Sequence, residues 1–190
     1  MSTLTVARKG RHAAMAADSL TTFEETRLPA AYDAHPEKVF RVGDALVGVV
    51  GYTAHVLVIE SALASLDRPP DLTSRRAIFE LLRDLHPILK EEYYLKPDAE
   101  EGDPYESSQV TLLVASPHGL FGVYDLREVH EYSRFWAMGS GADFALGAMF
   151  AVYDSDAPAA EVAATGARAG AEFDRGSGPP VRVYEIELAG

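Results

Sequence analysis

The sequence predicts an α+β protein folded as a four-layer α-β-β-α sandwich. Two observations carry this prediction: strand pairs that are rich in apolar residues, and helical segments that come in pairs between them. Strands that are apolar throughout need cover on both faces, and helices packed outside a sheet provide it. Two sheets packed face to face, each with a helix pair outside, satisfy this requirement.

The first half of the chain supplies two hairpins and one helix pair. The expected strands are residues 3–9, 11–17, 38–42 and 45–50. Apolar residues at helical spacing predict two helices, from Thr53 to Leu66 and from Thr73 to His86. Pro87 is expected to stop or kink the second helix, because proline lacks the N–H that a helix interior needs.

The second half repeats the pattern after an acidic loop at residues 96–107 that contains Pro and Gly. Its expected strands are Gln109–Ala115, Gly119–Tyr124, Val129–Phe135 and a closing strand Val181–Leu188. Its expected helices are Ala142–Tyr153 and Ala159–Phe173. Both helices are rich in Ala and Gly, whose small side chains permit close packing on a sheet.

Length and composition restrict the class of protein. With 190 residues and 47% hydrophobic content, residues 1–190 are expected to form a single domain. A formal net charge of −12 disfavours nucleic acid and anionic membranes as partners. The chain has no apolar signal segment and no apolar run long enough to span a bilayer, so we expect a cytoplasmic protein.

Neither metal nor cofactor chemistry is predicted. The chain contains no cysteine, which excludes disulfides, thiolate zinc sites and a cysteine nucleophile. Its six histidines show no metal-ligand spacing. We therefore expect no metal site and no bound cofactor.

Two hydroxyl residues, Ser2 and Thr3, follow the initiator methionine. Removal of Met1 would leave a small hydroxyl residue at the amino terminus. A free terminal amine can take the proton of a hydroxyl in the same residue, so that one residue supplies both base and nucleophile. The amino terminus is thus a candidate nucleophile.

Five short motifs occur in order along the chain. They are Ser2-Thr3-Leu4-Thr5-Val6 with Ala16-Ala17-Asp18, Lys38-Val39-Phe40-Arg41, Val50-Gly51-Tyr52-Thr53-Ala54, Met138-Gly139-Ser140-Gly141, and Asp174-Arg175-Gly176-Ser177-Gly178. Together they resemble the proteasome β-type family of N-terminal nucleophile (Ntn) hydrolases, close to HslV and to the bacterial proteasome homologues. The resemblance extends over nearly the whole chain and implies the four-layer sandwich of that family.

The resemblance implies a peptidase whose nucleophile is the first residue of the mature chain. The family's spacing, counted back from Asp18, gives Ser2, whereas Thr3 requires a one-residue insertion in the first hairpin. The family nucleophile is usually threonine, so serine is a departure. Serine lacks the γ-methyl group that restricts χ1, which leaves its hydroxyl less preorganised.

The other site residues also follow from the resemblance. Lys38 would stabilise developing negative charge beside Ser2, Asp18 would pair with Lys38, and the backbone N–H of Gly51 would bind the oxyanion. Three further residues would orient the terminal amine: Ser140, Asp174 and Ser177. Tyr52 stands where the family has a second glycine, so it should narrow or reshape the substrate pocket.

The resemblance further implies a homo-oligomeric ring, or stacked rings, that acts on peptides and unfolded proteins, with an ATP-dependent unfoldase as a candidate partner. Two other functions stay open. One is a catalytically silent ring or scaffold of the same fold, and the other is an Ntn amidase acting on a small molecule. Each motif taken alone also has an ordinary structural explanation, such as a helix cap at Gly139-Ser140-Gly141.

Overall fold

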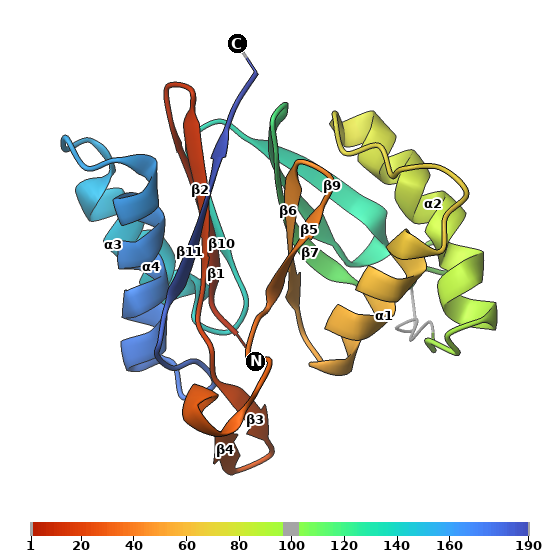
Figure 1. Ribbon diagram of the computed structural model, residues 1–190, viewed down its shortest axis with the longest axis horizontal. Coiled ribbons are helices and arrows are strands. Elements are labelled where there is room, and N and C mark those ends of the chain that lie inside the picture. Colours follow the sequence, from red (N-terminus) through yellow and green to blue (C-terminus); the bar gives the residue numbers. More distant parts are fainter. Residues whose placement is uncertain (1, 97–102, 190) are drawn as a thin grey trace.

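The structure is a computed structural model, and it describes residues 2–96 and 103–189. Four layers are visible in Figure 1: a helix pair, a sheet, a second sheet and a second helix pair. The predicted α-β-β-α sandwich is confirmed. The expected loop 96–107 falls partly on residues 97–102, which lie outside the described residues.

One sheet has four antiparallel strands in the order β10-β1-β2-β11. They are β1 (Leu4–Lys9), β2 (His12–Ala17), β10 (Phe135–Met138) and β11 (Arg182–Glu187). The register pairs Leu4 of β1 with Ala17 on one side and with Met138 on the other. The start of β1 therefore lies between the segments that begin at Asp18 and at Gly139.

The other sheet has five antiparallel strands in the order β5-β6-β7-β8-β9. They are β5 (Val39–Val42), β6 (Ala45–Val50), β7 (Thr111–Ser116), β8 (Gly119–Tyr124) and β9 (Glu128–Tyr132). The two sheets enclose a buried apolar layer. Its largest fully buried side chains are Leu4, Val6, Met15, Leu46, Leu113 and Leu120.

Each sheet is covered on its outer face by two helices (Figure 1). They are α1 (Ala54–Ala64) and α2 (Arg75–Glu91) on the five-stranded sheet, and α3 (Ala142–Tyr153) and α4 (Ala159–Phe173) on the four-stranded sheet. Small residues bring α4 close to β1, as predicted: the Thr5 hydroxyl donates to the Ala163 carbonyl at 2.8 Å. A side chain at Gly166 would collide with Met149 of α3.

The single strand expected at Val129–Phe135 is wrong. The segment forms two strands in different sheets: β9 pairs with β8, and β10 pairs with β1. The chain changes sheet at Ser133-Arg134, where the Arg134 carbonyl accepts a hydrogen bond from the Arg8 N–H at 2.8 Å. The residues at this change contain no Gly, Pro or Asn, the residues that most often mark a turn, so the sequence pattern does not reveal it.

Pro87 does not stop α2, because the helix continues to Glu91. Proline within a helix costs about 3 kcal/mol because it removes an N–H donor and crowds the preceding turn. The buried face of α2 extends past it, since Leu85 and Leu89 are both almost completely buried. Burial of a leucine contributes roughly 1.5–3 kcal/mol, which is enough to offset that cost. Burial of the leucines of α2 thus outweighs the helix-breaking tendency of Pro87.

Three short elements were absent from the prediction, and the first of them borders the site. A small hairpin, β3 (Thr21–Phe23) and β4 (Thr26–Leu28), projects beyond one end of the sandwich (Figure 1). The 3₁₀ helix Ala30–Tyr32 follows it. A second 3₁₀ turn, Asp125–Arg127, joins β8 to β9.

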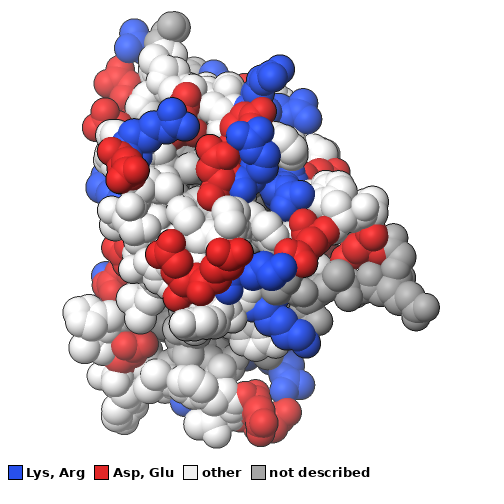
Figure 2. Space-filling view, turned by 90° about the vertical axis from the view of Figure 1, so that its right-hand side faces the viewer, with Lys and Arg blue, Asp and Glu red and all other residues white. Residues whose placement is uncertain are grey.

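The surface on the side of α1 and α2 carries Lys and Arg side chains interspersed with Asp and Glu side chains (Figure 2). The acidic excess is therefore not gathered into one patch on this face. Within residues 2–96 and 103–189, no helix is long and apolar enough to cross a membrane. In the same part of the chain, no group of three or more His, Cys, Asp or Glu side chains is placed to hold a metal ion.

Candidate active site

Ser2 and Thr3 lie on different sides of the extended chain at the start of β1. Ser2 lines a cavity of about 400 Å³ together with Lys38 and Gly51. The Thr3 side chain instead packs toward α4: a Cβ at Gly170 would lie 2.3 Å from its Oγ1. Consecutive side chains of an extended strand point to opposite faces. Of Ser2 and Thr3, only Ser2 therefore borders the cavity.

Thr3 is enclosed. Its side chain is fully buried, and its Oγ1 lies 2.7 Å from Ser177 Oγ. A Cβ at Gly141 would come within 2.0 Å of the same Oγ1. The Thr3 hydroxyl therefore has no room beside it for a substrate carbonyl.

The backbone of Ser2 is held by the turn before α3. Gly141 N–H donates to the Ser2 carbonyl, with 3.4 Å between nitrogen and oxygen. Gly139 has φ +101°, and a Cβ there would lie 2.0 Å from the same carbonyl oxygen. Glycine is required at position 139 both by this φ and by the close approach. The Gly-Ser-Gly motif thus positions Ser2.

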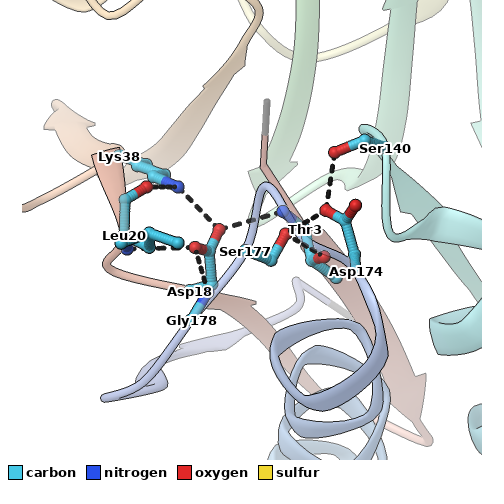
Figure 3. A network of polar contacts seen from close by, with 8 residues as sticks. All are labelled: Thr3, Asp18, Leu20, Lys38, Ser140, Asp174, Ser177 and Gly178. Atoms are coloured by element: carbon cyan, nitrogen blue, oxygen red, sulfur yellow. Dashed lines mark hydrogen bonds and ion pairs between the residues drawn. The ribbon is translucent and has the colours of Figure 1, made fainter. Parts of the chain in front are cut away.

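Asp18 is buried at the end of β2 and accepts four hydrogen bonds (Figure 3). Its Oδ1 accepts from Thr3 N–H at 2.9 Å and from Lys38 Nζ at 2.7 Å. Its Oδ2 accepts from the N–H groups of Leu20 at 3.0 Å and Gly178 at 2.9 Å. These four donors satisfy both oxygens of the buried carboxylate, as a buried polar group requires. Asp18 therefore joins the amino-terminal strand to the lysine and to the segment before β11.

Lys38 lies just before β5, with only 10% of its side chain exposed. Its Nζ donates to Asp18 at 2.7 Å and to the Leu20 carbonyl at 2.7 Å. Burial lowers the pKa of Lys38, while the charge and hydrogen bond of Asp18 oppose this effect. An ammonium group has three donors, and these two contacts use two of them.

A second carboxylate, Asp174, ends α4 on the other side of Thr3 (Figure 3). Its Oδ2 accepts from Ser140 Oγ at 2.6 Å and from Ser177 Oγ at 2.7 Å. Burial alone would raise the pKa of Asp174, but hydrogen bonds from these hydroxyls and from the Gly176 N–H lower it below its usual value. The structure thus brings Ser140, Asp174 and Ser177 together, with Thr3 linking them to Asp18.

Gly51 and Tyr52 form the cavity border between β6 and α1. Gly51 has φ +117°, a conformation that residues with a Cβ rarely adopt. Tyr52 is 79% exposed, and its ring meets His55 edge to face with centroids 5.5 Å apart. Burial lowers the pKa of His55. Tyr52 thus lines the cavity at an exposed position, and its expected narrowing or reshaping of the substrate pocket stays a prediction.

Sequence reasoning missed two further walls of the cavity. They are the β3–β4 hairpin, through residues 21–24, and the segment 35–37 that precedes Lys38. Threonines on both sides of Glu24-Glu25 were the available hairpin signal. The turn lacks the Gly or Asn that usually marks such turns, although Glu24 adopts the φ of +53° that those residues favour.

No protein-family model and no curated protein matched the chain. Among solved structures, the Thiobacillus denitrificans BPH, a bacterial proteasome homologue, is 43% identical over 98% of both chains, with a TM-score of 0.92. The same protein in complex with epoxomicin is 42% identical over 99% of this chain and 100% of that one, with a TM-score of 0.91.

The chain belongs to the proteasome β-type, HslV-like family. HslV from Trypanosoma brucei is 22% identical over 97% of this chain and 99% of that one, with a TM-score of 0.73, and it shares the fold. The family expected from the five sequence motifs is confirmed. It is a family of Ntn proteases.

Proposed function

We propose that this chain is an Ntn peptidase whose nucleophile is Ser2, exposed as the first residue once Met1 is removed. One observation carries the proposal: Ser2 lines the same cavity as Lys38 and Gly51. Thr3 is not proposed as the nucleophile, because its hydroxyl is enclosed between α4 and Ser177.

In the proposed reaction, the α-amine of Ser2 takes the hydroxyl proton while Oγ attacks the carbonyl carbon of a peptide bond. The Gly51 N–H donates to the oxygen that becomes negative. The carbon–nitrogen bond then breaks, and the leaving amine receives the proton. The resulting ester on Ser2 is hydrolysed by water, which restores the free hydroxyl and the acid product.

Lys38 supplies the positive charge that favours these steps, and Asp18 fixes its position through the 2.7 Å contact. We propose that Ser140, Asp174 and Ser177 act together to orient the terminal amine. Support comes from Asp174, whose lowered pKa keeps it negative beside the start of the chain. A negative carboxylate that accepts from two hydroxyls would hold those hydroxyls in fixed directions.

The Thiobacillus denitrificans BPH forms a complex with epoxomicin, which supports binding of the same compound by this chain. We propose that this chain binds epoxomicin in the cavity next to Ser2. Identity of 42% over 99% of the chain supports the transfer.

We also propose that the chain works as a homo-oligomeric ring or stacked rings in the cytoplasm, with peptides and unfolded proteins as substrates. Exposed aromatic side chains on the α3–α4 layer support assembly: Phe150 is 72% exposed and Phe173 is 69% exposed. Exposed apolar area of this kind is typical of protein interfaces. An ATP-dependent unfoldase partner stays a prediction.

The test combines intact mass, native mass and peptide hydrolysis by the purified protein. We expect loss of one methionine, a large homo-oligomer, and cleavage of short fluorogenic peptides that epoxomicin suppresses. Ser2→Ala should lack this activity while it keeps the oligomer. Retention of Met1 in protein that hydrolyses peptides, or full activity of Ser2→Ala, would overturn the proposal.

A further inference from the structure

The cavity beside Ser2 has an apolar inner wall. Leu20 and Val49 are 2% and 3% exposed, and Pro36 is also buried. Val56 of α1 adds a half-buried apolar side chain. An apolar wall of this kind suits the aliphatic part of a substrate side chain.

The border of the same cavity carries two carboxylates. Glu37 is half-buried, and its Oε1 pairs with the Arg182 guanidinium at 3.1 Å. Glu24 lies at the exposed turn of the β3–β4 hairpin. Neither Arg182 nor another arginine is among the residues that line the cavity.

The charge balance of the lining is therefore negative. Lys38 is the cation among these lining residues, and its charge is already matched by Asp18 at 2.7 Å. His35 at the rim is exposed. A cation that enters the cavity meets Glu37 and Glu24, whereas an anion meets like charges on both sides.

Resting on the proposed peptidase function, we propose that this cavity selects Lys or Arg as the residue whose carbonyl Ser2 attacks. The aliphatic stem of such a side chain would lie along Leu20, Pro36 and Val49, and its charged head would reach Glu37 and Glu24. Lysine and arginine commonly bury their methylene stems while the charged end stays near water or a carboxylate. A glutamate side chain in the same position would be disfavoured.

The effect should be moderate because both carboxylates are partly exposed. Ion pairs of this kind change an equilibrium by about two- to fivefold each, since solvent screens them. Glu37 is the more buried of the two and should have the larger effect. Arg182 competes for Glu37, so removal of its charge should strengthen the preference.

The experiment compares kcat/KM for three fluorogenic tripeptides that differ only in an Arg, Leu or Glu at the cleaved residue. We expect the order Arg, Leu, Glu at low salt, with the differences reduced at high salt. Glu37→Gln and Glu24→Gln should each lower the Arg-to-Leu ratio about two- to fivefold, and Arg182→Gln should raise it. Glu25→Gln is the matched control, because Glu25 neighbours Glu24 but pairs with Arg175 and is not among the cavity residues.

The outcomes separate the two proposals. Peptide hydrolysis with no preference for Arg, or with a preference that Glu37→Gln and Glu24→Gln leave unchanged, overturns the specificity and leaves the peptidase intact. If no tripeptide is hydrolysed, the peptidase proposal fails. Fluorescence polarisation of labelled Arg, Leu and Glu tripeptides then decides the specificity: tighter binding of the Arg peptide that Glu37→Gln weakens supports it, and equal binding overturns it.

Discussion

The chain at the start of β1 has an open cavity on one side and a closely packed helix on the other. On the cavity side, Ser2 borders about 400 Å³ of space together with Lys38 and Gly51. On the helix side, Thr3 is fully enclosed, and its hydroxyl is bonded to Ser177. Two adjacent hydroxyl residues with similar chemistry thus have different surroundings. Strand alternation therefore gives only one of these two hydroxyls access to the cavity.

The sharpest way to break this comparison is to remove each hydroxyl in turn. Ser2→Ala should reduce peptide hydrolysis at least about a thousandfold, because it removes the proposed nucleophile. Thr3→Ala removes the enclosed hydroxyl and should keep the activity within about tenfold of the parent, because the Thr3 hydroxyl does not border the cavity. Steady-state assays on both variants provide the measurement. A nearly inactive Thr3→Ala beside an active Ser2→Ala would reverse the assignment.

Lys38 tests the electrostatic part of the cavity side. Lys38→Ala should slow hydrolysis on the order of a hundredfold, because a positive charge at the reacting centre is lost. It should also reduce the free energy of unfolding by about 3 kcal/mol, since the buried partner Asp18 would lose its cation. Enzyme assays and urea unfolding measure the two effects separately. Parent-like turnover would exclude a catalytic role for Lys38.

Two glycines test how tightly the helix side is closed. Gly170→Ala places a Cβ within 2.3 Å of Thr3 Oγ1, so it should lower the free energy of unfolding by about 1–3 kcal/mol. Gly147→Ala is the matched control, because nothing lies within 4 Å of its new Cβ. Alanine there should stabilise α3 by roughly 0.5–1 kcal/mol. Equal unfolding midpoints for both variants would contradict the tight packing.

The Thr3 hydroxyl should matter for stability more than for chemistry. Thr3→Val keeps the shape but leaves the Ser177 hydroxyl without one of its partners, at a cost of about 1–2 kcal/mol in the free energy of unfolding. Activity should fall less than tenfold, because no reacting atom changes. A loss as large as that of Ser2→Ala would show that Thr3 takes part in the reaction.

The smallest expected effect is a pH dependence from Asp174. Its pKa is lowered in the folded protein, so it contributes stability above its unfolded pKa and loses it as the pH falls through the lower folded value. Asp174→Asn should therefore flatten the acid side of the stability curve. Urea unfolding between neutral pH and the acid range measures this. An unchanged slope would show that the hydrogen bonds from Ser140 and Ser177 do not stabilise the charged form.

Much of the fold could be predicted because its signals are local. The bounds of α3 and α4 were predicted from Ala142 to Tyr153 and from Ala159 to Phe173, and the structure has them there. The change of sheet at Ser133-Arg134 could not be predicted, since the next strand finds its partner in β1, more than 120 residues away in sequence. The predicted stop at Pro87 was wrong for the same reason, because tertiary burial of α2 outweighed the local helix-breaking effect of proline.

The candidate site also has a part that the sequence motifs predict and a part that they do not. Motif spacing named Ser2, Asp18 and Lys38, which the structure brings to one end of the sandwich. The cavity walls at residues 21–24 and 35–37 carry no family motif, so only the folded structure shows that they line the cavity. Spacing favoured Ser2 over Thr3, and the cavity that only Ser2 borders supports the same choice.

The most direct test of the central claim is to locate the acyl group during turnover. Protein mixed with a rapidly acylating peptide ester is quenched in acid, and its amino-terminal peptide is sequenced by tandem mass spectrometry. We predict a chain that starts at Ser2 and carries the acyl group on that residue. An acyl group on Thr3, or on a chain that still begins with Met1, would contradict the account.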